Sequence, residues 1–317
     1  KQENFTYLLR MTQPKNYVEF QNKINRLYDK LISLEKIASA NLLLLDPNEP
    51  RKIPGTPSQT SSEFLINDEQ GKWAERIIRT SLAVTFPNYK FVAYGESSTL
   101  NAGDPEFNKF YANIQKELDT IGKRPDLLVF DKETGKKVPE NFMGLSTNEQ
   151  AQIVSTALMG LEIRSSAQLL KKYKPSKSRA SLSFTAKLED LRIVKKWIDT
   201  FGVPLFYVQV LFDSAHIISF KKILEILITN NRFTPKQNPS GVFTVANDPK
   251  NQFKTTFQIH LGQGSKFADI TAMPDVIGKR LELQRGRLLH YCSLEGGKLI
   301  PDQNAFNNAV DEAKNAE

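Results

Sequence analysis

The chain has 317 residues, of which 40% are hydrophobic, and a formal net charge of +8 at pH 7. This length and composition are typical of a packed globular protein and exclude the disordered, collagen-like and coiled-coil classes. The longest apolar run, 205–220, is interrupted by polar residues, so no membrane-spanning helix is expected. A single cysteine and the absence of an apolar leader ahead of Lys1 predict a cytoplasmic location in a reducing compartment.

The positive charge is concentrated in one stretch of the chain. Residues 164–196 contain ten Lys and Arg against two acidic residues, Glu189 and Asp190, so the rest of the chain sums to zero. A concentrated positive field favours binding of a polyanion, because neutralised phosphates release condensed counterions. The alternative is a solvated, lysine-rich loop without a partner. The three histidines and Cys292 lack metal-ligand spacing, so no structural zinc site is expected.

Hydrophobic spacing predicts helices in the first part of the chain. Apolar residues recur at three- and four-residue steps over 15–45, which predicts a long amphipathic helix. A proline-rich linker, 46–62, follows, and the next helix is expected over 68–86. The elements predicted after it are, in chain order, a strand at 89–94, a helix at 105–121, strands at 126–130 and 159–164, a helix at 185–201, strands at 205–212 and 216–220, and a helix at 221–229.

The order of these elements predicts an α/β core of the α+β type, with a mixed central sheet flanked by helices. The step from the strand at 159–164 through a helix to the strand at 205–212 demands a parallel, right-handed crossover. The strands before it are joined by hairpin-like connections.

Three parts of the chain are expected. They are an N-terminal helix and linker in 1–62, the core in 63–230, and a C-terminal extension with β-strands in 231–317. In the extension, strands are predicted at 253–261 and 279–291, with a short helix from Gln303. The extension is either a subdomain or a continuation of the same core.

Three acidic residues are predicted to lie where these strands and helices converge. Asp126 begins the second strand, Glu162 lies within the third, and Glu75 is on the helix before the first. Neighbouring strands can bring Asp126 and Glu162 side by side, which is costly without a cation and therefore suggests Mg²⁺. Each residue also has a structural interpretation: Asp126 as a turn residue, Glu162 as an exposed strand position, and Glu75 as a helix surface residue.

Two linked segments resemble the signature of PD-(D/E)xK nucleases. They are 124–131, with the sequence RPDLLVFD, and 160–166, with the sequence GLEIRSS. More narrowly, 162–166, EIRSS, 183–190, SFTAKLED, and 203–213, VPLFYVQVLFD, are similar to AccI-type type II restriction endonucleases, and the resemblance covers about residues 70–225. The resemblance implies a restriction-endonuclease-like core and Mg²⁺-dependent cleavage of double-stranded DNA at a short palindrome, leaving 5′-phosphate ends.

The resemblance also implies roles for particular residues. Asp126, Glu162 and the backbone carbonyl of Ile163 would hold one or two Mg²⁺ ions, and Glu75 would bind a water of the metal shell or a second ion. The signature's lysine position holds Arg164, which cannot deprotonate water because it stays protonated. In some nucleases of this superfamily the lysine is displaced onto the following helix, and Lys187 is predicted to take that part. Its alternative is a surface lysine at a helix start.

DNA contacts are expected from the basic stretch and from the C-terminal extension. The residues predicted to bind phosphates or base edges are Gln168, Lys171, Lys172, Lys174, Lys177, Arg179, Arg285 and Arg287. The segment 279–287 alternates apolar and polar residues, as in a β-ribbon inserted in a groove or an edge strand guarded by charge.

A palindromic site favours a homodimer, because a two-fold protein matches a two-fold sequence. The helix predicted over 15–45 either supplies a dimer surface or packs on its own chain. Two other functions stay open: a DNA repair or junction nuclease of the same core, and a DNA-binding protein that has lost catalysis, which Arg164 suggests. No Gly-rich phosphate loop is present, so no nucleotide cofactor is expected.

Overall fold

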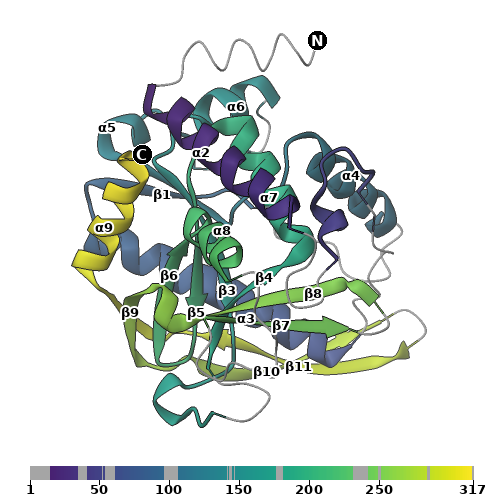
Figure 1. Ribbon diagram of the computed structural model, residues 1–317. Coiled ribbons are helices and arrows are strands. Elements are labelled where there is room, and N and C mark those ends of the chain that lie inside the picture. Colours follow the sequence, from purple (N-terminus) through teal and green to yellow (C-terminus); the bar gives the residue numbers. More distant parts are fainter. Residues whose placement is uncertain are drawn as a thin grey trace.

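A mixed seven-stranded sheet lies at the centre of the computed structural model (Figure 1), in the order β1-β2-β3-β5-β6-β9-β12. The structure describes residues 15–34, 41–51, 53, 61–95, 106–140, 142, 145, 147–175, 181–230, 242–248, 251–283 and 286–315. Among these residues no helix combines the length and the apolar character needed to cross a membrane.

The central sheet confirms the predicted α+β architecture. Its strands are β1 (Tyr89–Ala93), β2 (Leu127–Asp131), β3 (Met159–Ser165), β5 (Leu205–Val210), β6 (Ser214–Ser219), β9 (Ser265–Ala272) and β12 (Lys298–Pro301). The β3–β5 pair is parallel, as the predicted crossover requires, and the other neighbours are antiparallel.

Helices cover both faces of the sheet (Figure 1). Helices α3 (Ser62–Thr85) and α9 (Gln303–Lys314) share one hydrophobic core with one face. The other face forms a second core with α2 (Lys15–Ile32), α7 (Leu188–Phe201) and α8 (Phe220–Thr229). The remaining helical elements are α4 (Phe107–Thr120), α5 (Lys132–Gly135), α6 (Thr147–Val154), and the 3₁₀ turns η1 (Leu42–Leu45), η2 (Leu170–Lys172) and η3 (Leu261–Gln263).

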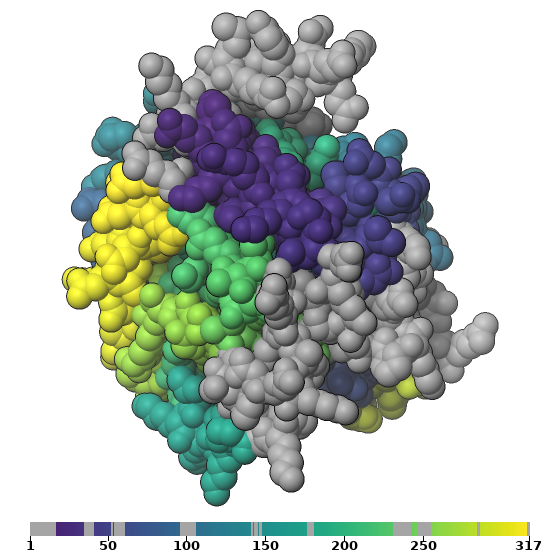
Figure 2. All heavy atoms as spheres, in the orientation of Figure 1, coloured from purple at the N-terminus to yellow at the C-terminus, as the bar shows by residue number. Residues whose placement is uncertain are grey.

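The N-terminal helix is shorter than predicted and packs on its own chain. It ends at Ile32, and the residues at 42–45 form the separate turn η1 instead of continuing it. The apolar residues Phe20, Ile24 and Tyr28 are buried, and the Tyr28 hydroxyl donates to the Leu45 carbonyl at 2.9 Å. Figure 2 shows α2 lying directly against α8. The apolar stripe of α2 is therefore used within the chain.

The helix predicted over 185–201 begins later than expected, because its first residues form a strand. In strand β4 (Ser183–Lys187) the residues Ser183, Phe184 and Ala186 are buried and Lys187 is exposed, and α7 starts only at Leu188. β4 pairs with β8 (Asn251–His260), which also pairs with β7 (Phe243–Asp248). The local pattern does not reveal β4, since its partner lies some seventy residues away and pairing with that partner decides its conformation.

The C-terminal residues continue the core instead of forming a separate subdomain. β9 and β12 extend the central sheet, and Phe306 of α9 stacks on Phe86 with 4.0 Å between ring centroids. The strand predicted at 279–291 is wrong as a single element. It is a hairpin, in which β10 (Asp275–Glu282) pairs with β11 (Leu288–Glu295) as a two-stranded ribbon. β10 is exposed along nearly its whole length, whereas β11 packs on α3.

Candidate functional site

Asp126 and Glu162 lie opposite each other where β2 and β3 meet. The antiparallel register pairs Leu127 with Leu161, and one further step places Asp126 across from Glu162. The Asp126 carboxylate accepts a hydrogen bond from the Ile163 backbone N–H at 2.5 Å. The two carboxylates predicted to be neighbours are therefore neighbours, and one of them is fixed by the backbone of the other's strand.

Glu162 is buried, with 2% of its side chain exposed, and only half of its carboxylate is used. Its Oε1 atom accepts from Lys123 Nζ at 2.6 Å and lies 3.0 Å from Arg164 Nη2. Its Oε2 atom has no hydrogen-bond partner in the described part of the chain. A buried carboxylate oxygen without a partner is costly, and a hard cation or its water would satisfy it.

Glu75 adds a third carboxylate from α3. Burial raises the pKa of Glu75, and the charge of Glu162 raises it further. Burial likewise holds the pKa of Asp126 well above its usual value, with Glu162 and Glu75 adding to the effect. Carboxylates that raise each other's pKa in this way repel one another, and a bound metal cation would relieve that repulsion.

Two cations and one further acid complete the cluster. Arg164 Nη2 donates to Asp190 Oδ2 at 2.6 Å, and Lys123 Nζ lies 3.6 Å from the same oxygen. Burial alone would raise the pKa of Asp190, but the charges of Lys123 and Arg164 outweigh it and hold the pKa below its usual value. Burial and Arg164 lower the pKa of Lys123, but three neighbouring carboxylates outweigh both and raise it. Both cations are therefore held charged.

The sequence analysis missed Lys123 and Asp190, and a glycine explains how Lys123 reaches the cluster. Gly122 has φ +84°, and a Cβ there would lie 2.3 Å from the Ile193 carbonyl oxygen. Only glycine allows this segment to approach α7 so closely, and the Lys123 N–H then donates to the same carbonyl at 2.9 Å. The one sequence signal for Lys123 is its place three residues before Asp126.

Among the ion pairs of the cluster, none joins Lys187 to the paired carboxylates. It is exposed at the end of β4 and forms no ion pair with Asp126 or Glu162. Its charge acts instead on Glu189 and Asp190, at the first turn of α7. The structure thus brings together Asp126, Glu162, Ile163, Arg164 and Glu75, whereas Lys187 lies at the start of α7, where its charge acts on Asp190.

The first part of the predicted DNA-binding segment is anchored to the end of the sheet. The Asp213 carboxylate accepts from the backbone N–H groups of Leu170 and Lys171, both at 2.9 Å. The Gln168 carbonyl accepts from Phe212 N–H at 2.9 Å.

On this anchored base the side chains of Lys171, Lys172 and Lys174 are exposed, while Gln168 is half-buried. Arg287 is exposed beside the β10–β11 turn. Lys177, Arg179 and Arg285 lie outside the described residues.

The donor set fits Mg²⁺. Among the described residues no three His, Cys, Asp or Glu side chains converge closely enough to hold a metal ion. Mg²⁺ does not need such a cage, since it is usually bound by one or two carboxylates, waters and substrate phosphates. Asp126, the free oxygen of Glu162 and the Ile163 carbonyl provide that kind of oxygen donor set.

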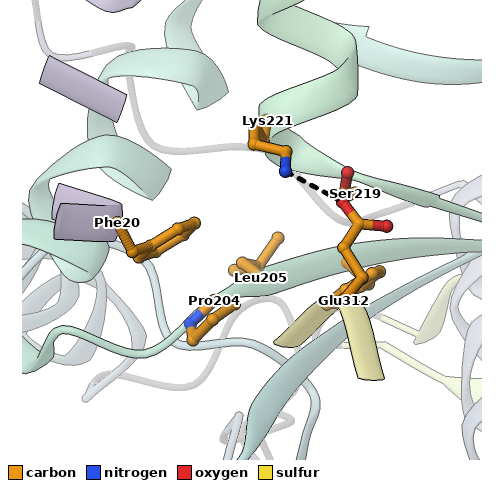
Figure 3. A pocket seen from close by; sticks show the side chains of 7 residues that line it. Phe20, Pro204, Leu205, Ser219, Lys221 and Glu312 are labelled. Atoms are coloured by element: carbon orange, nitrogen blue, oxygen red, sulfur yellow. Dashed lines mark ion pairs between the residues drawn. The ribbon is translucent and has the colours of Figure 1, made fainter. Parts of the chain in front are cut away.

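A small pocket lies elsewhere, between α2, the start of β5 and α9 (Figure 3). Phe20, Pro204 and Leu205 line it, and Lys221 and Glu312 form an ion pair of 3.8 Å at its edge. None of the clustered carboxylates lines this pocket, so it is separate from the Asp126 and Glu162 site.

Comparison with known proteins identifies the family. The family model described as AccI restriction endonuclease matches residues 25–180 and 174–314. These segments include Asp126, Glu162, both cations of the cluster and the β10–β11 ribbon. No curated protein and no solved structure matches the chain. Since the family match runs through nearly the whole described structure, the chain belongs to the AccI restriction endonuclease family, which makes it a nuclease.

Proposed function

We propose that this protein is a type II restriction endonuclease with a PD-(D/E)xK site, cutting both strands of DNA at a short palindrome with Mg²⁺. One observation carries the proposal: Asp126, just before β2, faces Glu162 in the middle of β3, and among the described residues Glu162 Oε2 has no partner while two cations lie beside Oε1. The matched family supplies the DNA substrate.

Asp126, Glu162 and the Ile163 carbonyl would hold the metal. Glu75 would bind a water molecule of the metal's shell or a second metal ion. Bound there, Mg²⁺ would polarise the scissile phosphate and lower the pKa of its water. The protein's own part is to hold the two carboxylates in place. The Ile163 N–H holds Asp126, and Arg164 holds Glu162 against α7.

The reaction is hydrolysis of a phosphodiester. The oxygen of water forms a bond to phosphorus and loses a proton to solvent, while the bond from phosphorus to the 3′ oxygen breaks. The 3′ oxygen takes a proton and becomes a hydroxyl, and the phosphate stays on the 5′ end. Negative charge on the non-bridging oxygens grows on the way, so nearby fixed cations lower the barrier.

Helix α3 connects the parts proposed to meet DNA. Gln70, with its amide oxygen turned to the chain after β3, accepts from the backbone N–H groups of Ser166 and Ala167 at 3.1 and 3.3 Å. One and two turns further on, Trp73 Nε1 donates to the Gly296 carbonyl and Arg76 to the Leu294 carbonyl. Glu75 lies between them. The basic segment, the carboxylate site and the ribbon therefore share one rigid support.

We assign phosphate contacts to the lysines of the basic segment and groove contacts to the turn of the β10–β11 ribbon. The exposed lysines Lys171, Lys172 and Lys174 suit phosphates because they are flexible point charges. We propose DNA contacts also for Gln168 and Arg287, which the structure describes, and for Lys177, Arg179 and Arg285, which lie outside the described residues. A homodimer is proposed because two identical sites related by a two-fold axis cut both strands of a palindrome.

The test is cleavage of plasmid and phage DNA with Mg²⁺. Discrete fragments are expected, with ends that map to one palindrome and carry 5′-phosphate. The isosteric variant Asp126→Asn should bind DNA without cutting it. Asp131→Asn is the matched control on the same strand: Asp131 caps α5 far from the cluster, and asparagine caps a helix equally well.

Three results would contradict the proposal. Uncut DNA across many sequences and divalent metals, with DNA binding retained, would show an inactive DNA-binding protein. Cutting at branched structures instead of a sequence would show a repair or junction nuclease. Full activity of Asp126→Asn would remove the carboxylate site from the mechanism.

A further inference from the structure

The signature position for lysine holds an arginine whose charged group is already engaged. Arg164 Nη2 contacts Asp190 Oδ2 at 2.6 Å and Glu162 Oε1 at 3.0 Å, while its Nε atom is buried without a hydrogen-bond partner in the described part of the chain. The guanidinium thus ties β3 to the first turn of α7. This geometry suits a positioning residue that orients Glu162 and leaves the catalytic cation to another side chain.

We propose that Lys123 is the catalytic lysine of this nuclease and that its ammonium donates to a non-bridging oxygen of the scissile phosphate. The inference rests on the proposed function and deepens it. Lys123 Nζ lies 2.6 Å from Glu162 Oε1, so the ammonium is in contact with a carboxylate proposed to bind the metal. The scissile phosphate must come to the same place.

Lys123 can reach a ligand without leaving its partners. An ammonium has three donors, and here two are directed at Glu162 and Asp190. The Lys123 side chain is 23% exposed, against 2% for Glu162, so solvent reaches part of this side chain while one donor is left over. A substrate oxygen can take that donor while both carboxylate contacts persist.

The fold places Lys123 independently of the signature strand. Gly122 and the backbone hydrogen bond to Ile193 seat the segment on α7, and Pro125 packs over Gly160, where a Cβ would come within 2.7 Å of the proline ring. A single short segment therefore delivers both Lys123 and Asp126. This segment precedes β2, whereas the signature places its lysine on β3, at the position of Arg164.

Lys187 is the rival for this role. It lies on the exposed end of β4 and forms no ion pair with either paired carboxylate. Its charge acts on Glu189 and Asp190, the acids at the start of α7. The two lysines therefore make different predictions for the same experiment.

The step assigned to Lys123 transfers no proton. The ammonium stays intact and its hydrogen bond strengthens as the phosphate oxygens gain charge, while water attacks and the bond to the 3′ oxygen breaks as described above. Removing one such donor typically slows the chemical step about 100- to 1,000-fold.

The sole cysteine of the chain allows a direct test. In a Cys292→Ser background, Lys123→Cys and Lys187→Cys are each prepared, then treated with 2-bromoethylamine, which converts the new thiol into a lysine analogue. Single-turnover cleavage with Mg²⁺, DNA binding with Ca²⁺ and thermal unfolding are measured before and after. Lys314→Met, an exposed lysine on α9, serves as the substitution control.

For Lys123→Cys we expect cleavage to slow at least about 100-fold and DNA binding to change less than about threefold. Alkylation should then raise the cleavage rate of this variant at least about tenfold. Lys187→Cys should lose less and show no such rescue. If Lys123→Cys is poorly folded, Lys123→Met and Lys123→Arg, compared for DNA binding and cleavage, separate lost charge from lost structure.

The inference is overturned if Lys123→Cys cuts DNA at the parent rate, or if alkylation rescues only Lys187→Cys. It is also overturned if a matching loss of DNA affinity or of thermal stability accounts for the slower cleavage. Failure of the proposed function is a different result. In that case the unsubstituted protein itself cuts no DNA, and the inference falls with it.

Discussion

Replacing Gly122 by alanine should destabilise the protein and displace its proposed catalytic segment. Gly122 has φ +84°, and a Cβ at this position would lie 2.3 Å from both the Ile193 carbonyl oxygen and the Trp197 nitrogen. These atoms belong to the backbone of α7, which cannot move aside as a flexible side chain would. The segment carrying Lys123 must shift instead.

The expected loss follows from the contacts. A left-handed conformation costs a non-glycine residue about 1–2 kcal/mol. Separating Lys123 N–H from the Ile193 carbonyl removes a hydrogen bond of 2.9 Å, worth about 1 kcal/mol net. The alanine returns about 0.4–1 kcal/mol by restricting the unfolded chain. The clash itself adds to the cost, so the free energy of unfolding should fall by about 2–3 kcal/mol.

Urea unfolding followed by tryptophan fluorescence measures this loss, and single-turnover cleavage measures its effect on the site. Gly71→Ala is the matched control, because Gly71 lies within α3 and a Cβ there meets nothing within 4 Å. That variant should gain about 0.5–1 kcal/mol, since glycine is a poor residue inside a helix. A Gly122→Ala protein within about 0.5 kcal/mol of the parent, cutting at the parent rate, would refute the close approach to α7.

Three further results are expected. Asp190→Asn should lower the free energy of unfolding by about 3 kcal/mol at pH 7, because it removes the buried partner of two cations. Folding lowers the pKa of Asp190, so this loss is complete above about pH 4 and shrinks as the pH falls further. Denaturant unfolding should therefore show a smaller difference between variant and parent at pH 3.5 than at pH 7. Adding Ca²⁺ at about 100 times its Kd should stabilise the protein by about 2.7 kcal/mol in a thermal melt, and an equal shift in Glu162→Gln would exclude Glu162 as a ligand. Lys172→Ala and Lys174→Ala should each lower the slope of log affinity for DNA against log salt by about one, and an unchanged slope would remove that lysine from the phosphate contacts.

Much of the core follows from local pattern. Strands β2 and β3 and the body of α7 are short or strongly periodic apolar segments, and the sequence predicts them within a few residues. Their order requires the parallel β3–β5 pair, which the structure confirms. From that order alone Asp126 and Glu162 are expected on neighbouring strands, and the register places them opposite each other.

The errors have a common physical cause. β4 was predicted as the start of a helix, and the β10–β11 hairpin as one strand. For β4 the pairing partner, β8, is distant in sequence, and for the hairpin the turn lies within an alternating run of apolar and polar residues. Local propensity does not reveal either feature. The misplaced start of the helix matters for the site, because it puts Lys187 on an exposed strand end.

The sequence by itself determined the acidic pair, the family resemblance and the stretch where positive charge gathers, since each depends on residue identity and short spacing. Only the tertiary structure decided which basic side chain and which further acid join the acidic pair. Lys123 and Asp190 come from segments 39 and 28 residues away from Glu162 along the chain, in opposite directions. They come together beside Glu162, where Lys123 contacts both acids, because Gly122 lets one segment lie on α7 and Arg164 ties that helix to β3. Side-chain contacts of this range depend on how the layers pack, which no local pattern contains.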